Sequence, residues 1–219
     1  MYKSNFPSIF KKFYLRVLRS KKIISGEAST YYLFYPHTPE RVIHKYPKIK
    51  IIILLRNPVD RAYSHYNLNV KLNRETKSFE DAIINERLRI ENELVNLKKD
   101  KYYDSDSLHF FSYLERGKYY NQIIRWLNYF PENQIKILLS DDFFACPQKT
   151  YSEILSFLDI SNFKLKNPKV YNRVTVDSIN KETRTNLESY FKFSNKKLFE
   201  LLKRKNIWNK EGLISDKTR

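Results

Sequence analysis

The residues best suited to chemistry lie in the stretch LLRNPVDRAYSHY, from Leu54 to Tyr66. An apolar run ends at Arg56, and Asn57 and Pro58 then favour the N-cap and first position of a helix. The free N–H groups of a helix start attract anions, and an arginine binds phosphate through a planar fork of donors. Ser64 follows two turns into the helix, so the spacing lets Arg56 and Ser64 close on one phosphate.

The same residues are equally compatible with a purely structural role. In that interpretation Arg56 and Arg61 pair with carboxylates such as Asp60, and Ser64 is a small packing residue. Asp60 also occupies the position of the acidic residue in a capping box. Four residues share one face of the expected helix: Arg61, Ser64, His65 and Leu68. The pattern alone leaves both interpretations open.

Two apolar runs without polar alternation predict parallel strands that are buried on both faces. They are Lys48 to Arg56 and Gln134 to Phe143, and KIISGEAS, from Lys22 to Ser29, is a weaker third candidate. Helical patterns occupy residues 79–97, 119–130 and 150–158. This alternation predicts an α/β fold, in which right-handed crossovers build a parallel sheet flanked by helices.

The length of 219 residues suits a single domain with a core of its own. We expect a basic lead-in at 1–22, an α/β body at 23–165 and a helical C-terminal tail at 166–209, with an exposed loop at 98–109. The tail has apolar residues at helical spacing, and they are Leu187, Tyr190, Phe191, Leu198, Leu201 and Leu202. Trp126 and Trp208 lie on apolar helical patterns, which predicts core positions for both.

The composition narrows the classes of partner. The chain has 41 Lys plus Arg against 24 Asp plus Glu, so its net charge is +17. This charge favours anionic partners such as nucleotides, nucleic acid, acidic glycans or membranes. The alternative is that the basic residues only form a solvated surface. The four histidines lack metal-ligand spacing, and Cys146 has no disulfide partner. We find no export signal and no apolar run that could span a membrane, and we expect a cytoplasmic protein.

Several segments together resemble the sulfotransferase family. They are GEASTYYLFYP at 26–36, PERV at 39–42, IIILLRNPVDRAYSHY at 51–66, SFEDAI at 78–83, RGKYYNQIIRWLNYFP at 116–131 and SFLDI at 156–160. The resemblance covers about 5–208 and is greatest for the branch of heparan sulfate N- and O-sulfotransferases and their bacterial relatives.

This resemblance implies a P-loop-NTPase-like sulfotransferase fold. It also implies transfer of a sulfuryl group from 3′-phosphoadenosine 5′-phosphosulfate to a hydroxyl or amine acceptor, such as a saccharide, without a metal. The family's R-x-P-x-x-R-x-x-S stretch holds the 3′-phosphate of the donor, which assigns that role to Arg56 and Ser64 here.

Two other signatures of the family have no counterpart in the chain. One is the P-K-x-G-T-T loop, whose N–H groups and lysine hold the 5′-phosphosulfate, and the other is a K-E-x-x-F-F stretch with the general base. We therefore expect the N-terminal part with the central strand to be missing, through a truncated gene, a misplaced start codon, a separate N-terminal partner polypeptide, or decay to a remnant. The catalytic residues stay unassigned, and we expect little or no sulfuryl transfer from the isolated chain.

The resemblance points to two further residues. Glu27, in GEAS, is expected to line the acceptor pocket, with a structural turn or ion-pair role as the alternative. Arg173, in VYNRVT, stands near the place of a basic loop that closes over the donor, with a solvated arginine as the alternative.

Two other functions were weighed against sulfuryl transfer. A P-loop kinase is poorly supported, since G-x-x-x-x-G-K-[ST] is absent from the sequence. A non-catalytic basic module for nucleotide, acidic glycan or nucleic acid ranks second, because the basic charge and part of the cleft remain without the catalytic loop. A lysine precedes two tyrosines at 101–103 and again at 118–120, and such tyrosines can stack on bases.

Overall fold

A computed structural model describes residues 24–166 and 179–208 of the chain. The chain divides into two compact units, residues 1–32 and 33–219, and each is treated by itself. All helices and strands named below belong to the second unit. In chain order they are α2 (Thr38–Lys45), β1 (Ile51–Leu55), α3 (Pro58–Lys71), α4 (Phe79–Ile84), α5 (Glu86–Lys99), α6 (Asp106–Phe111), the 3-10 turn η2 (Glu115–Gly117), α7 (Tyr119–Leu127), the 3-10 turn η3 (Glu132–Gln134), β2 (Ile135–Leu139), α8 (Ser140–Ala145), α9 (Pro147–Phe157) and α10 (Lys181–Leu201).

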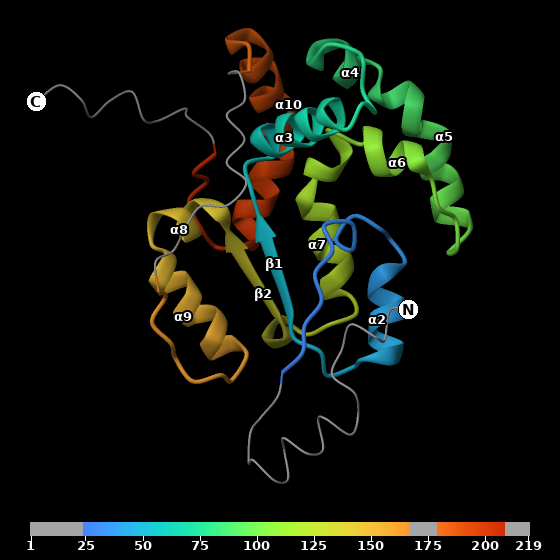
Figure 1. Ribbon diagram of the computed structural model, residues 1–219. Coiled ribbons are helices and arrows are strands. Elements are labelled where there is room, and N and C mark those ends of the chain that lie inside the picture. The colour runs from blue at the N-terminus through green and yellow to red at the C-terminus, as the bar shows by residue number, and fades with distance from the viewer. Residues whose placement is uncertain (1–23, 167–178, 209–219) are drawn as a thin grey trace, which may run out of the picture. The chain divides into compact units, whose positions relative to one another are not determined.

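The two strands pair in parallel, as the apolar runs predicted. The register aligns Ile51 with Ile135 and Leu55 with Leu139, so both strands end at the same edge (Figure 1). The chain passes from β1 to β2 through the helical segment from α3 to α7, which confirms the α/β class. The third strand predicted at Lys22 to Ser29 is wrong for its described part, because residues 24–29 have no regular secondary structure.

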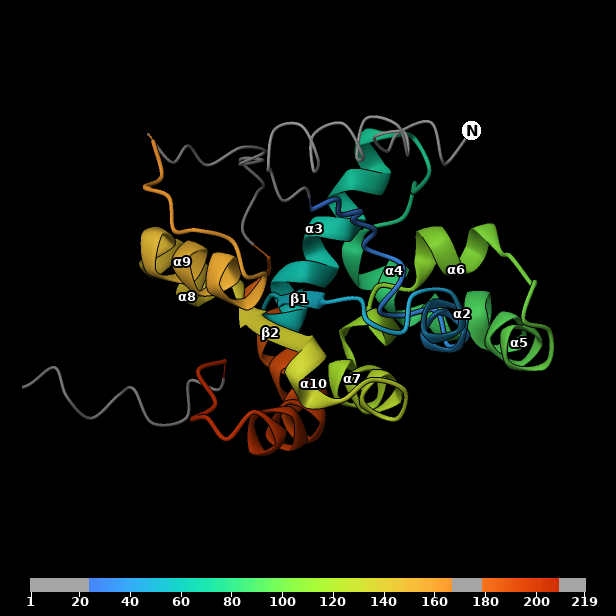
Figure 2. The same cartoon turned by 90° about the horizontal axis from the view of Figure 1, so that it is seen from below.

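One face of the sheet packs on α7 and α10, which lie together on that side in Figure 2. Alternate strand residues such as Ile53, Leu55 and Leu139 point into this layer because side chains alternate along a strand. The helices contribute the following buried residues to it: Tyr119, Ile123 and Trp126 from α7, and Leu198 and Phe199 from α10. The main core of this unit therefore lies between the sheet and these two helices.

Among the described residues, α9 covers the opposite face of the sheet over β2, whereas the β1 side chains on that face are exposed. Lys136 on β2 forms an ion pair of 3.0 Å with Glu153 on α9, and its neighbour Leu138 is only 5% exposed. On β1, however, Ile52 and Leu54 are 39% and 58% exposed. The expectation that both strands are buried on both faces is therefore wrong for this side of β1.

The helical segment between the strands is more broken than its pattern predicted. The single helix expected at 79–97 is two helices, α4 and α5, which meet at Asn85. The amide of Asn85 donates to the carbonyl of Asp81 at 2.7 Å, a local side-chain bond that competes with the helical ladder. The loop predicted at 98–109 is also shorter, because α5 continues to Lys99 and α6 begins at Asp106.

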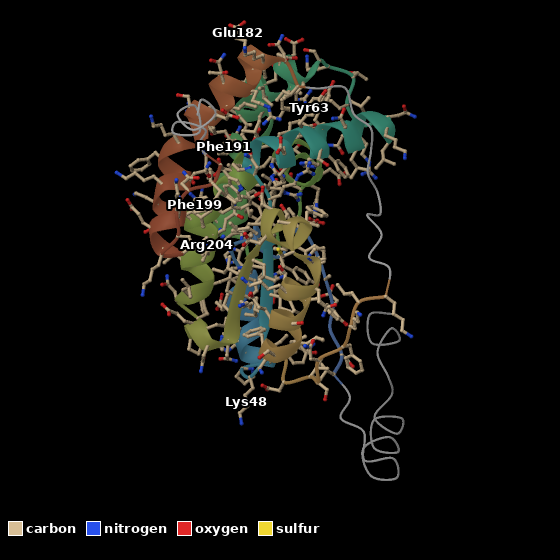
Figure 3. The ribbon with its side chains drawn as sticks, turned by 90° about the vertical axis from the view of Figure 1, so that its left-hand side faces the viewer. Lys48, Tyr63, Glu182, Phe191, Phe199 and Arg204 are labelled. Atoms are coloured by element: carbon tan, nitrogen blue, oxygen red, sulfur yellow. The ribbon has the colours of Figure 1, made fainter. Side chains whose placement is uncertain are left out.

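Within the tail predicted at 166–209, the structure describes the helix α10, Lys181–Leu201. Asn180 caps this helix, and its side chain accepts from the amides of Glu182 and Thr183 at 2.8 and 3.4 Å. Figure 3 labels Phe191 and Phe199 along α10, and both are buried. Both tryptophans are core residues, as predicted, with Trp126 at 5% and Trp208 at 4% exposure.

Candidate phosphate-binding site

The site begins where β1 turns into α3. Asn57 is the N-cap of α3, and its side-chain oxygen accepts from the Val59 amide at 2.9 Å, while Pro58 occupies the first turn. The main-chain N–H of Arg61 bonds to the Asn57 carbonyl at 2.9 Å, which closes the first helical turn. The predicted helix start is thus confirmed, and it places the positive end of a 14-residue helix at the turn that follows β1.

Arg56 and Ser64 both belong to this strand-turn-helix unit. The Arg56 side chain is exposed, and its guanidinium forms no ion pair or hydrogen bond with any residue of the described ranges. The hydroxyl of Ser64, which is half-buried on α3, likewise has no hydrogen-bond partner in this part of the chain. Both polar groups are therefore available to a ligand.

Asp60 does not pair with Arg56 or with Arg61. Its carboxylate accepts from Arg184 on α10 at 2.6 Å, so the alternative that Arg56 or Arg61 pairs with Asp60 is wrong. Arg61 instead turns inward and donates through Nη2 to the carbonyl of Tyr113. Asp60 thereby joins α3 to α10, and the arginine at the end of the strand stays unpaired among the described residues.

Positive charge gathers around the helix start. Burial lowers the pKa of Arg61, and the charges of Tyr119 and Glu86 oppose this, while the charge of Arg56 lowers it further. The two guanidiniums thus repel each other. An anion at Arg56 would relieve this repulsion, which is the electrostatic setting that a phosphate site requires.

His65 does not contribute a charge to the site. Burial lowers its pKa to about 3, and the neighbouring charges of Arg116 and Arg61 lower it as well, so the imidazole is neutral near pH 7. Its ring stands edge-on to that of Tyr113, with centroids 5.0 Å apart. Of the helical face predicted from the sequence, His65 and Arg61 are therefore structural, whereas Leu68 is 52% exposed.

Of the two other residues suggested by the resemblance, one belongs to the first unit and the other lies outside the described residues. Glu27 belongs to the first unit, where its Oε1 accepts from the Tyr32 hydroxyl at 2.9 Å. Arg173 lies outside the described residues. Their roles in the acceptor pocket and over the donor remain predictions.

Several residues that position the site could not be identified from the sequence by charge or spacing. Tyr119 Oη donates to the Arg56 carbonyl at 2.9 Å, and Gly117 packs against Pro58. The only signal for these two was their place within RGKYYNQ. Glu86, whose buried carboxylate holds the main chain before Gly117, had no signal, because it follows a helical pattern like any solvated acid.

Neither a metal site nor a membrane span is found in the part of the chain that the structure describes. Residues 24–166 and 179–208 contain no cluster of three or more His, Cys, Asp or Glu side chains that could hold an ion. Within the same ranges, every helix is too short or too polar to cross a lipid bilayer.

The sequence as a whole matches a known family. A family model described as "Sulfotransferase domain" aligns with residues 15–218. The chain belongs to the sulfotransferase domain family. The match includes the β1–α3 turn, so the unpaired Arg56 stands within a sulfotransferase domain.

Individual relatives agree with this assignment. "Membrane-associated sulfotransferase kil1" of Dictyostelium discoideum is 29% identical over 256 residues, which cover 87% of this chain and 54% of the relative. "Carbohydrate sulfotransferase 15" of Mus musculus is 26% identical and covers 65% of this chain and 29% of the relative. "Bifunctional heparan sulfate N-deacetylase/N-sulfotransferase 3" of Mus musculus is 31% identical, covering 62% and 14%.

A solved structure supports the fold. The crystal structure of a sulfotransferase from Alicyclobacillus acidocaldarius matches with a TM-score of 0.69 and 32% identity, and the match covers 84% of this chain and 66% of that one. The sulfotransferase-like α/β architecture expected from the resemblance is thus confirmed. The chain spans about half the length of the kil1 protein and smaller shares of the other two relatives.

Proposed function

We propose that this sulfotransferase domain binds 3′-phosphoadenosine 5′-phosphosulfate, with Arg56 and Ser64 holding its 3′-phosphate. The observation that carries the proposal is the unpaired, exposed guanidinium of Arg56 at the start of α3. A guanidinium offers two parallel N–H donors to a phosphate, and the helix N-terminus adds a favourable dipole. The Ser64 hydroxyl, two turns along, supplies a third donor from the same element.

We propose further that the reaction is sulfuryl transfer to a saccharide hydroxyl or amine. The names of the carbohydrate and heparan sulfate relatives support such an acceptor. The bond between the sulfur and the bridging phosphate oxygen breaks, and a new bond forms from the sulfur to the acceptor oxygen or nitrogen. The acceptor loses its proton to a base, and 3′-phosphoadenosine 5′-phosphate leaves with the electron pair of the broken bond.

No described residue is assigned here as the base or as the group that holds the 5′-phosphosulfate. Glu27 is proposed as an acceptor-pocket residue and Arg173 as a residue that closes over the donor. A separate N-terminal polypeptide that supplies the 5′-phosphosulfate loop remains a prediction.

The donor site is tested by titration calorimetry with 3′-phosphoadenosine 5′-phosphate and with adenosine 5′-phosphate, which lacks the 3′-phosphate. We expect wild type to prefer the former, and Arg56→Ala to weaken that preference by about tenfold or more, because it loses a charge-assisted bidentate contact. Arg87→Ala is the matched control, since the exposed Arg87 pairs only with Glu91 on α5 at 2.9 Å in the described chain. Equal binding of the two nucleotides by wild type would refute the assignment.

The same variants distinguish the alternative of a non-catalytic basic module. A module that uses its net charge of +17 would bind polyanions through many scattered cations. Heparin or nucleic acid binding would then be strong, equal in Arg56→Ala and Arg87→Ala, and unaffected by the nucleotide. Competition by 3′-phosphoadenosine 5′-phosphate that Arg56→Ala abolishes would contradict that alternative.

A further inference from the structure

The segment from Tyr113 to Tyr119, here called the supporting turn, contacts the β1–α3 turn at both of its ends and at Gly117. At one end, the carbonyl of Tyr113 accepts from the Arg61 guanidinium. At the other end, the Tyr119 hydroxyl donates to the main-chain carbonyl of Arg56 at 2.9 Å. The second bond is made to the backbone of Arg56, the residue proposed to bind the phosphate, so it restrains the main chain from which that side chain extends.

Gly117 lies close to both Phe191 of α10 and Pro58 at the start of α3. A Cβ added at Gly117 would lie 2.8 Å from Cε1 and Cζ of Phe191 and 3.0 Å from Cβ of Pro58. Phe191 is fully buried on α10, and Figure 3 shows it beside the ribbon of α3, so its ring has little room to withdraw. Ordinary contact between carbons begins at about 3.5 Å, so a methyl group here would require the Phe191 ring to withdraw by roughly 0.5 Å or more and Pro58 by a few tenths of an ångström.

Buried side chains of α5 and α7 form hydrogen bonds with the main chain of the supporting turn. The two carboxylate oxygens of Glu86 accept from the amides of Leu114 and Glu115, at 2.6 and 2.8 Å, and Glu86 is only 4% exposed. On the other side, the buried Gln122 amide donates to the carbonyls of Glu115 and Arg116 at 3.3 and 3.1 Å. Buried groups that bond to both the donors and the acceptors of a turn favour one backbone conformation, because any other conformation would break these hydrogen bonds.

We propose that the supporting turn sets the position of Arg56 for the 3′-phosphate, and that Gly117 and Tyr119 are positioning residues of this site. The inference rests on the proposed donor site. Binding geometry must hold within about 0.5 Å to be productive, which is the size of the shift that a side chain at Gly117 imposes. The contacts end on Arg56 and Pro58, the two residues that flank the N-cap, so a change in the turn reaches the phosphate without altering either ligand group.

The chain offers closely matched variants for the test. Gly117→Ala introduces the clash, whereas Gly26→Ala adds the same methyl group where nothing lies within 4 Å. Tyr119→Phe removes only the hydroxyl that bonds to Arg56, and Tyr120→Phe removes the hydroxyl of the next residue, whose ring lies beneath Lys197 at 5.6 Å. Tyr119→Phe keeps the test valid even if Gly117→Ala does not fold.

The measured quantity is the ratio of the Kd for adenosine 5′-phosphate to the Kd for 3′-phosphoadenosine 5′-phosphate. We expect Gly117→Ala to lower this ratio by about tenfold and Tyr119→Phe by about threefold, with circular dichroism unchanged and both control variants like wild type. If Arg56→Ala lowers the ratio but Gly117→Ala and Tyr119→Phe do not, the positioning role is wrong and the donor site stands. If wild type shows no preference, the donor site itself fails.

Discussion

Glu75, in the loop after α3, has the carboxylate with the most hydrogen bonds in the described part of the chain. Removing its charge should lower the free energy of unfolding by an amount that depends on pH. Its side chain is 1% exposed and accepts from Arg89 Nη1 and Nη2 at 2.5 and 3.1 Å. It also accepts from the Tyr113 hydroxyl at 3.0 Å, and from the amides of Thr76 and Lys77 at 3.1 Å each. One side chain thus joins the loop to α5 and to the first residue of the supporting turn.

The size of the effect follows from the pKa of this carboxyl group. Burial by itself would raise the pKa, but the Arg89 guanidinium, the Lys77 amide and the Tyr113 hydroxyl outweigh it and lower the pKa from 4.5 to about 2. At about 1.4 kcal/mol for each tenfold change in the proton equilibrium, this corresponds to about 3 kcal/mol of stability. A lowered pKa stabilises the fold fully above the unfolded value of 4.5, and the contribution falls as the pH drops toward 2.

The perturbation is Glu75→Gln, and the assay is urea unfolding of the full chain at pH 7 and at pH 3. We expect the variant to lose about 3 kcal/mol at pH 7 and about half of that at pH 3, because at pH 3 this carboxyl is protonated in the unfolded chain while it is still mostly ionised in the folded chain. Arg87→Gln is the control, because its ion pair with Glu91 is exposed and should give no measurable loss at either pH. A loss from Glu75→Gln that is the same at both pH values would show that lost packing, and not the charge, explains it.

Two further changes test how the site and the core are held. Asn57→Ala removes the oxygen that accepts from the Val59 amide and should cost about 1 kcal/mol in urea unfolding, whereas Asn57→Asp should retain most of the stability. Trp208→Ala should cost about 3–5 kcal/mol, because this ring is 4% exposed, packs edge-on against Phe199 at 5.0 Å and donates to Asp141 at 3.1 Å. A loss below about 1 kcal/mol would place Trp208 outside the core.

The features that could be predicted from the sequence are those that short-range chemistry determines. Asn57 followed by Pro58 specifies a helix start, because the cap and the fixed proline φ act within a few residues. The two apolar runs predicted β1 and β2 for a similar reason, since a short run rich in β-branched residues and without polar alternation favours a strand, although one face of β1 is exposed. The ordered motifs from residue 26 to 160 also sufficed to predict the family.

Two secondary-structure predictions were wrong, and each has a physical reason. One helical pattern over 79–97 did not reveal the break at Asn85, because periodicity measures the burial of side chains and not the continuity of the backbone. KIISGEAS has the composition of a strand, but a strand also needs a neighbour to pair with, and local composition does not supply one.

Tertiary structure alone decided the state of each charged group around the turn. Arg56, Arg61 and Glu86 are ordinary charged residues in the sequence, yet the first is exposed and unpaired among the described residues, whereas Arg61 turns inward to a carbonyl. Glu86 is buried against two main-chain amides. Pairing and burial depend on which distant segments meet at a point, and for this turn those segments are α5, α10 and the supporting turn. The sequence therefore determined that a helix starts at Asn57 and Pro58, and packing decided that Arg56 is exposed beside it while Arg61 is turned inward.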